Sequence, residues 1–245
     1  MSLLKNLKTD DNIKGEERDS VGGFGILDSG LYAAKITLAY ATKSEGGAIG
    51  LVTGFKTEDG KDLRQTFWMT NKAGQNFYEK DGQKNYLPGF NQANALALLT
   101  VGKEISELDT EQKVANVYSK EARAEVPTKV DMLVDLIGQD ILLGVLRQTV
   151  DKTQKDGNGV YQPTGETREE NEIDKIFRAK DKLTVAEIRA GGADAQAKFH
   201  ETWAEKWTGK TRDRSTKGGG TTGAPKGAGA AAGGTAKPKT SLFGN

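Results

Sequence analysis

The sequence predicts a mainly β protein with a few helices, built as a partly open β-barrel with a C-terminal helix and a disordered tail. Apolar and polar residues alternate in several short segments, as expected of strands that bury one face. Three other segments have the spacing and end signals of helices. After residue 208 the chain is rich in Gly, Ala, Thr and Lys, a composition typical of segments that do not fold.

The first three strands are expected close together near the N-terminus of the body. They are predicted at residues 31–42, 48–55 and 63–70. In the first, alternation puts Ile36 and Tyr40 on one face and Lys35 on the other. In the third, Phe67 points inward, so Trp68 points outward. Asp59-Gly60 is a strong hairpin signal between the second and third strands.

The later elements alternate between helices and strands. Residues 89–102 follow Pro88 and predict a helix that ends at Gly102. Residues 128–138 predict another, with Thr128 as N-cap and Gly138 as terminator. Further strands are expected at residues 113–119, 140–150, 172–179 and 183–188, a hairpin loop at 152–163, and a last helix at 193–207 carrying Phe199, Trp203 and Trp207. Five to seven twisted strands of this kind predict a small barrel.

Composition divides the chain into three parts. Residues 1–29 form a flexible leader, residues 30–207 the folded domain, and residues 208–245 a basic Gly/Ala-rich tail. From Thr208 onward seven basic residues accompany one acidic residue, so the tail carries +6 and residues 1–207 carry −5 out of a net +1. Because the domain is mildly acidic, nucleic-acid binding by it requires a local surface rather than its overall field.

Composition also excludes several kinds of metal site, disulfides and a membrane-spanning segment. There is no cysteine, so disulfides and thiolate metal sites are excluded, and a reducing cytoplasm is the simplest compartment. His200 is the single histidine, which excludes a histidine-rich metal site. No apolar run has the length of a membrane span, and the N-terminus lacks a signal-peptide core. We expect no cofactor, no metal, no membrane contact and no enzymatic activity.

Aromatic and basic residues are interleaved in three segments, at residues 64–72, 77–90 and 147–161. Single-stranded nucleic acids bind by stacking bases on aromatic rings while Lys and Arg neutralise the phosphates. The alternative for any one aromatic is a core position. From this pattern the candidate binding residues are Arg64, Trp68, Lys72, Tyr78, Lys80, Lys84, Tyr86, Arg147, Lys152, Lys155 and Tyr161.

Four stretches together resemble the single-stranded DNA-binding replication proteins of short-tailed bacteriophages. They are "GLYAAKITLAYATKSEGGAIG", "KNYLPGFNQANALALLTVGKE", "VPTKVDMLVDLIGQ" and "RQTVDKTQKDGNGVYQPTGETREENEIDKIFRA", within residues 21–207. The resemblance implies an OB-fold that coats single strands during phage DNA replication and recombination in the host cytoplasm, without catalysis. Carried over by position, it adds Lys35 to the binding face and includes Arg64, Trp68, Tyr86, Arg147, Lys152, Lys155 and Tyr161.

The tail ends in an apolar pair, Leu242 and Phe243, preceded by Lys237 and Lys239. Many single-stranded DNA-binding proteins end instead in an acidic tail with an apolar tip, so the resemblance departs here. We expect these four residues to bind a partner, a replication, recombination or transcription protein, at a surface that is apolar and acidic. The alternative is that the tail's bases only add affinity for DNA.

Two other functions fit the sequence. The first is a transcription or replication cofactor that acts mainly through protein–protein contacts of the tail. The second is a Mg²⁺-dependent nuclease using the carboxylates of residues 166–174, although their spacing fixes no octahedral site and a solvated acidic face is the better explanation. The cluster consists of Glu166, Glu169, Glu170, Glu172 and Asp174.

Overall fold

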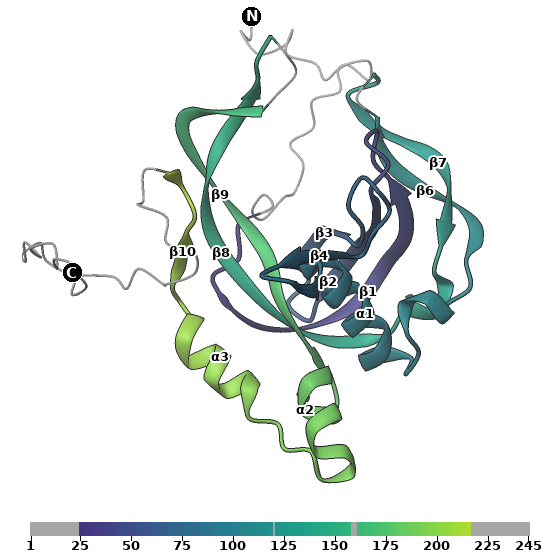
Figure 1. Ribbon diagram of the computed structural model, residues 1–245, viewed down its shortest axis with the longest axis vertical. Helices are drawn as coiled ribbons and strands as arrows, with labels where there is room; N and C mark the ends of the chain where they lie inside the picture. The colour runs from purple at the N-terminus through teal and green to yellow at the C-terminus, as the bar shows by residue number, and fades with distance from the viewer. Residues whose placement is uncertain (1–24, 120, 158–160, 217–245) are drawn as a thin grey trace, which may run out of the picture.

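The computed structural model describes residues 25–119, 121–157 and 161–216, and within them the chain is mainly β with three α-helices, which confirms the predicted class (Figure 1). The strands are β1 (Gly30–Lys43), β2 (Ile49–Thr57), β3 (Asp62–Trp68), β4 (Phe77–Lys80), β5 (Gln83–Tyr86), β6 (Glu111–Ser119), β7 (Ala124–Met132), β8 (Asp140–Lys155), β9 (Tyr161–Arg178) and β10 (Thr211–Asp213). The α-helices are α1 (Pro88–Thr100), α2 (Val185–Gly191) and α3 (Phe199–Trp207).

The expected partner-binding residues of the tail, Lys237, Lys239, Leu242 and Phe243, lie outside the described residues, as does most of the expected leader. The last described strand before that part of the tail, β10, belongs to the sheet, because it pairs in parallel with β8. In β10 the guanidinium of Arg212 donates to Gln148 at 2.6 Å and bonds the carboxylates of Glu172 and Asp174. The sheet therefore extends past the expected domain boundary at residue 207.

In the described residues one eight-stranded sheet contains every strand except the separate β4–β5 hairpin. Strand β1 is its centre, pairing with β8 through residues 30–35 and with β2 through residues 34–43. Strand β3 extends the sheet beyond β2, and β9 extends it beyond β8. The hairpins β6–β7 and β8–β9 project toward the same end of the molecule on opposite sides (Figure 1).

The sheet does not close, since β3 and β9 share no described strand pairing. One side chain bridges them instead. The amide oxygen of Gln65 on β3 accepts from the backbone N–H of Ile173 on β9 at 2.6 Å, and its amide nitrogen donates to the Ile173 carbonyl at 3.3 Å. Gln92 of α1 donates to the same carbonyl at 2.7 Å. The gap between β3 and β9 is thus bridged by the side-chain amides of Gln65 on β3 and Gln92 on α1.

The main core lies between the curved sheet and α1. Phe55, Phe67, Leu96 and Leu143 are among its fully buried side chains. Helix α1 forms as predicted, with Pro88 in its first turn and Gly102 at φ +75° just after it. The alternating pattern of the strands gives the sheet an apolar face, and the apolar residues of α1 pack against that face.

A β-bulge changes the expected face of β1 halfway along the strand. The register shifts between Ile36 and Leu38. Ile36 therefore packs in the main core, whereas Tyr40 lies on the opposite face, in a second cluster with Val52 of β2 and Ala115 of β6. A bulge inserts one residue and reverses the alternation after it. The prediction that Ile36 and Tyr40 share a face is wrong for this reason.

A third cluster holds α3 against the outer face of β8 and β9. Trp203 and Trp207 of α3 are buried there with Phe177 and Leu146. A Cβ at Gly144 would lie 3.1 Å from the Trp203 ring, so the glycine leaves space for the indole. The indole N–H of Trp203 donates to Asp174 at 2.8 Å. The last helix begins at Phe199, six residues later than expected.

Two predicted elements have the wrong type. Residues 128–138 form the end of β7 and a short 3₁₀ helix at Val134–Leu136, because β7 pairs along its whole length with β6 and at its end with β1. Residues 183–188 begin helix α2 rather than a strand. There the Thr184 side chain accepts from the Glu187 N–H while the Glu187 carboxylate accepts from the Thr184 N–H, which is a capping box.

Candidate nucleic-acid interface

Trp68 is an exposed aromatic of the predicted set at the β3 edge of the main sheet. Strand alternation buries Phe67 and leaves Trp68 45% exposed at the end of β3, as the sequence predicts. The indole lies against Gly50 of the neighbouring β2, where a Cβ would come within 2.9 Å of the ring. One face of the ring therefore rests on the sheet, and the exposed part is available to a ligand.

A groove of about 380 Å³ runs beside Trp68. One wall is the end of β3, and the other is the start of α1, where Leu87, Pro88 and Gly89 lie. Gly89 allows the close approach, because a Cβ there would lie 2.2 Å from the Trp68 carbonyl oxygen. Glu172 of β9 also lines the groove, and its carboxylate is bound by Arg212 and Arg214. That pairing reduces its repulsion of a phosphate.

The β4–β5 hairpin carries further aromatic and basic residues, and it directly precedes the groove residues Leu87, Pro88 and Gly89 in the sequence. Its turn, Asp81-Gly82, has φ +54° and +74°, the left-handed pair that a tight hairpin needs. Tyr86 is 57% exposed and stacks at 5.0 Å from Phe90, and Lys84 lies 4.8 Å over the Phe77 ring. Tyr86 and Phe77 are cross-strand partners and so share a face with Lys84.

Tyr78 and Lys80 point to the other face of the same hairpin, because they pair with Asn85 and Gln83. Tyr78 is 44% exposed. The side chain of Lys72 runs along the β1–β2 turn, 3.2 Å from where a Cβ of Gly46 would lie. Lys72, Lys80 and Lys84 make no ion pair within the described residues. We call Trp68, Lys72, Tyr78, Lys80, Lys84 and Tyr86 the β3–β5 surface.

The predicted bases on β8 and β9 are paired with acids. Arg147 makes two hydrogen bonds to Glu169, at 3.0 and 2.7 Å, and one to Asp28 at 3.0 Å. The hydrogen bonds to Glu169 and then Asp28 raise the pKa of Arg147 above its ordinary value. Lys152 pairs with Glu166 at 2.9 Å. These bases already neutralise carboxylates on the neighbouring strand.

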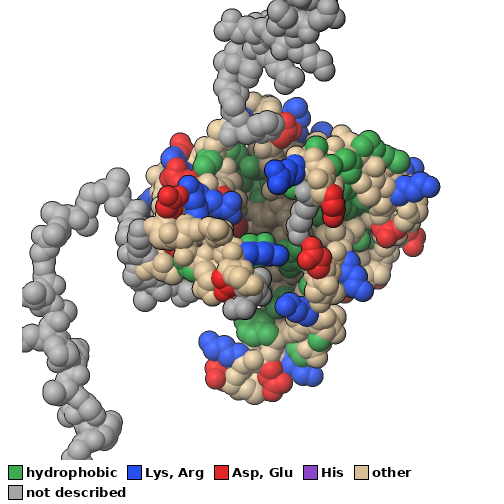
Figure 2. All heavy atoms as spheres, turned by 90° about the horizontal axis from the view of Figure 1, so that it is seen from above, with side chains coloured by type: hydrophobic (Ala, Val, Ile, Leu, Met, Phe, Trp, Pro, Cys, Tyr) green, Lys and Arg blue, Asp and Glu red, His purple; other side chains and the backbone are tan. Residues whose placement is uncertain are grey.

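The tip of the β8–β9 hairpin keeps an exposed aromatic and a base together. Tyr161 is 62% exposed, and Lys155, its direct cross-strand partner, lies 5.4 Å over its ring. Viewed onto the projecting ends of the two hairpins, the molecule is hollowed, and basic and acidic side chains alternate around the hollow (Figure 2). Charge of one sign does not line this face.

Two further predicted residues are tied into the fold. Arg64 on β3 donates to Glu125 at 2.6 Å, to the Tyr40 hydroxyl and to the Asn116 carbonyl, which fastens the β6–β7 hairpin to β3. Lys35 pairs with Asp140 at 2.6 Å on the opposite side of the sheet from the main core. The members of the β3–β5 surface thus lie within residues 68–86, with Tyr78 and Lys80 on the opposite face of the hairpin from Lys84 and Tyr86. Lys35 and the β8–β9 residues lie elsewhere in the sheet.

The carboxylates of residues 166–174 bind bases rather than one another. Glu170 pairs with Arg168 at 2.9 Å, and Glu172 and Asp174 bind Arg212. Across the described residues no group of three or more acidic or histidine side chains is placed to hold a metal ion. The same residues include no helix long and apolar enough to cross a membrane.

Sequence reasoning missed one exposed aromatic, Tyr118 on β6, which is as open as Tyr86. Alternation with buried Ala115 and half-buried Val117 in the segment "KVANVYS" was the available signal. No protein-family model matches the chain, and a search of curated proteins finds no match.

Proposed function

We propose that the protein binds single-stranded DNA without sequence preference and protects it during phage DNA replication and recombination in the host cytoplasm, without catalysing a reaction. The observation that supports this most is the β3–β5 surface. Three aromatic side chains are exposed there, and three lysines beside them have no acidic partner within the described residues. Exposed rings stack on bases of any sequence, and free lysines neutralise phosphates.

The groove beside Trp68 indicates the path that a bound strand would follow across the β3–β5 surface. A strand lying over the indole would pass between β3 and the start of α1 and reach Tyr86 on the adjoining hairpin. Duplex DNA cannot offer unstacked bases to these rings. The proposed interface therefore favours single strands over duplexes through stacking, while the lysines set the salt dependence.

The arrangement of strands supports an OB-fold as the finer description. Such folds are five-stranded, partly open barrels that bind nucleic acids on an outer face. Here β1, β2, β3, β8 and β9 are consecutive neighbours, and α1 and Gln65 span the open edge between β3 and β9. We propose that the hairpins β4–β5 and β6–β7 are additions to this five-stranded unit.

The test is a binding titration of the full chain with fluorescently labelled oligo-dT and a duplex of equal length, followed by anisotropy. We expect tighter binding of oligo-dT, weakening by at least about tenfold between about 50 and 200 mM salt, as phosphate contacts release counterions. Equal affinity for the duplex, or an affinity for oligo-dT that does not respond to salt, would contradict the proposal.

A further inference from the structure

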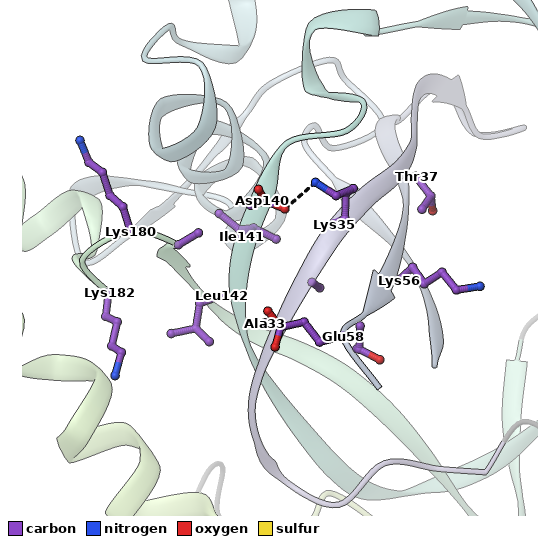
Figure 3. Close-up of a pocket in the computed structure, with 13 residues that line it drawn as sticks. Ala33, Lys35, Thr37, Lys56, Glu58, Asp140, Ile141, Leu142, Lys180 and Lys182 are labelled. Carbon is purple, nitrogen blue, oxygen red and sulfur yellow. Dashed lines mark hydrogen bonds and ion pairs between the residues drawn. The ribbon is translucent and has the colours of Figure 1, made fainter. Parts of the chain in front are cut away.

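A second pocket, of about 850 Å³, lies over β1 and β8, between the end of β2 and the turn after β9 (Figure 3). Its floor is formed by β1 and β8, through Ala33, Ala34, Ile141 and Leu142. Residues 56–58 at the end of β2 border one side, and residues 179–182 after β9 border the other. Trp68 and the other members of the β3–β5 surface do not line it. Its size is in the range of small-ligand pockets.

Four lysines and two carboxylates surround this apolar floor. Lys35 and Asp140 neutralise each other at 2.6 Å. Lys56 lies 3.9 Å from Asp62, a long contact between exposed groups. Within the described residues, Lys180 and Lys182 make no ion pair. Glu58 is the one acidic lining residue apart from Asp140. Among the described residues, the lysines of the lining without an ion pair are therefore Lys180 and Lys182, on one side of the pocket, whereas Lys56 on the other side pairs with Asp62 and lies near Glu58.

The turn that carries Lys180 and Lys182 is fixed by local bonds. The Arg178 guanidinium donates to both oxygens of Asp181, at 2.9 and 2.7 Å, and the Lys182 N–H donates to the Arg178 carbonyl at 2.8 Å. The hydrogen bond from Arg178 holds the pKa of Asp181 below its ordinary value. Asp181 is thus bonded by Arg178, and the attraction of Lys180 contributes least to the lowering of its pKa.

The backbone at Lys182 is unusual for a lysine. Its φ of +62° lies in the left-handed region, which glycine adopts without cost and other residues adopt rarely. Glycine would adopt this φ more readily, so a lysine at this position carries a conformational cost. In Figure 3 the Lys180 and Lys182 side chains stand on the side of the pocket opposite Lys56.

We propose that this pocket binds a phosphate-bearing ligand. Phosphate oxygens are held by the ammonium groups of Lys180 and Lys182, and the uncharged part of the ligand rests on Ala33 and Leu142. A free nucleotide and a segment of DNA strand both offer this chemistry. The inference does not depend on the function proposed for the β3–β5 surface, because the two surfaces share no residue.

Calorimetric titration of the full chain with pyrophosphate, ATP and oligo-dT tests the inference. The test variant is Lys180→Ala with Lys182→Gly, which removes both charges and places glycine where the backbone favours it, so the fold is retained. The control is Lys103→Ala, an exposed lysine on the turn after α1, outside the pocket. Melting temperatures of all three proteins confirm folding.

We expect the test variant to lose at least about tenfold in affinity for a phosphate-bearing probe, and the control to match the wild type. Loss for pyrophosphate and ATP with unchanged oligo-dT affinity identifies a free nucleotide or polyphosphate as the ligand. Loss for oligo-dT alone identifies the DNA strand. If none of the probes distinguishes the test variant from the wild type, or if Lys103→Ala loses as much, the pocket is not a phosphate site.

Discussion

The β3–β5 surface and the β8–β9 hairpin contain the same kinds of residue in different surroundings. On the β3–β5 surface, Lys72, Lys80 and Lys84 have no acidic partner within the described residues. On β8, Arg147 and Lys152 face Glu169 and Glu166 across the strand pair. An interleaved aromatic and basic sequence therefore does not by itself define a binding surface, since neighbouring strands decide whether the bases are free.

The difference has a clear energetic meaning. A base already bonded to a carboxylate must give up that partner to hold a phosphate, and the released carboxylate then repels the phosphate. A free lysine bears neither cost. We therefore expect most of the DNA affinity to come from the β3–β5 surface and little from the β8–β9 hairpin, and the following variants compare the two.

The largest difference is expected between Trp68→Ala and Tyr161→Ala. Loss of the Trp68 indole removes a stacking platform and should cost on the order of 1–3 kcal/mol of oligo-dT binding. Tyr161 stands alone with Lys155 at the hairpin tip, so its removal should cost less. Anisotropy titrations measure both. A larger loss for Tyr161→Ala would place the main contact on the β8–β9 hairpin.

The fold provides the control for that comparison. Trp68 is half-exposed and packs on Gly50, so Trp68→Ala should change the melting temperature little. Marked unfolding by Trp68→Ala would show that the indole is part of the core.

A second comparison separates the two faces of the β4–β5 hairpin. Tyr86 shares its face with Lys84 and lies next to the groove beside Trp68, whereas Tyr78 is on the other face. Tyr86→Ala should cost about 1 kcal/mol of oligo-dT binding, and Tyr78→Ala distinctly less. Equal losses would mean that the strand wraps around the hairpin rather than following one face.

The bases are compared by their effect on salt dependence. Lys84→Ala should reduce the slope of log affinity against log salt by about 0.7, the value for one phosphate contact on a single strand. Arg147→Ala should leave that slope unchanged, because its charge is taken up by Glu169 and Asp28. Titrations at four salt concentrations give the slopes. A reduced slope for Arg147→Ala alone would reverse the assignment.

The smallest effect on binding is expected from Glu187, which lies in neither region. Burial raises the pKa of Glu187, but hydrogen bonds from the N–H groups of Thr184, Phe199 and Lys198 outweigh it, so the pKa is lowered overall. Its contribution to stability is therefore present above its ordinary pKa of 4.5 and is lost as the pH falls through the lower folded value.

Melting temperatures between pH 7 and pH 3 measure this contribution. The Glu187→Gln variant should melt lower than the wild type at pH 7, and the difference should shrink toward pH 3. Its oligo-dT affinity should be unchanged at neutral pH. A difference that grows as the pH falls would have the wrong sign.

Where periodicity and turn signals agreed, the sequence predicted the individual element correctly. The alternation around Phe67, the Asp59-Gly60 hairpin and the Pro88 start of α1 are examples. The predicted helix at residues 128–138 is wrong because the pairing of β7 with β6 outweighs the local capping pattern. The predicted strand at residues 183–188 is wrong because the Thr184–Glu187 capping box begins helix α2 there.

The candidate site was predictable only in part. The outward position of Trp68 follows from alternation within a single strand. The pairing of Arg147 with Glu169 depends on the register of β8 with β9, which local sequence does not contain. The same holds for the lysine pocket, whose lining comes from four separate segments of the chain.

Tryptophan fluorescence tests the proposed role of the β3–β5 surface most directly. Trp203 and Trp207 of α3 are buried against β8 and β9, so Trp68 is the one exposed indole among the three of the chain. Stacking on a base quenches an indole. We predict strong quenching of the wild type by oligo-dT, little by duplex DNA, and almost none in Trp68→Phe, which retains a ring and still binds. Quenching that persists in Trp68→Phe, or that duplex DNA produces equally, would contradict the stacking of single-stranded bases on Trp68.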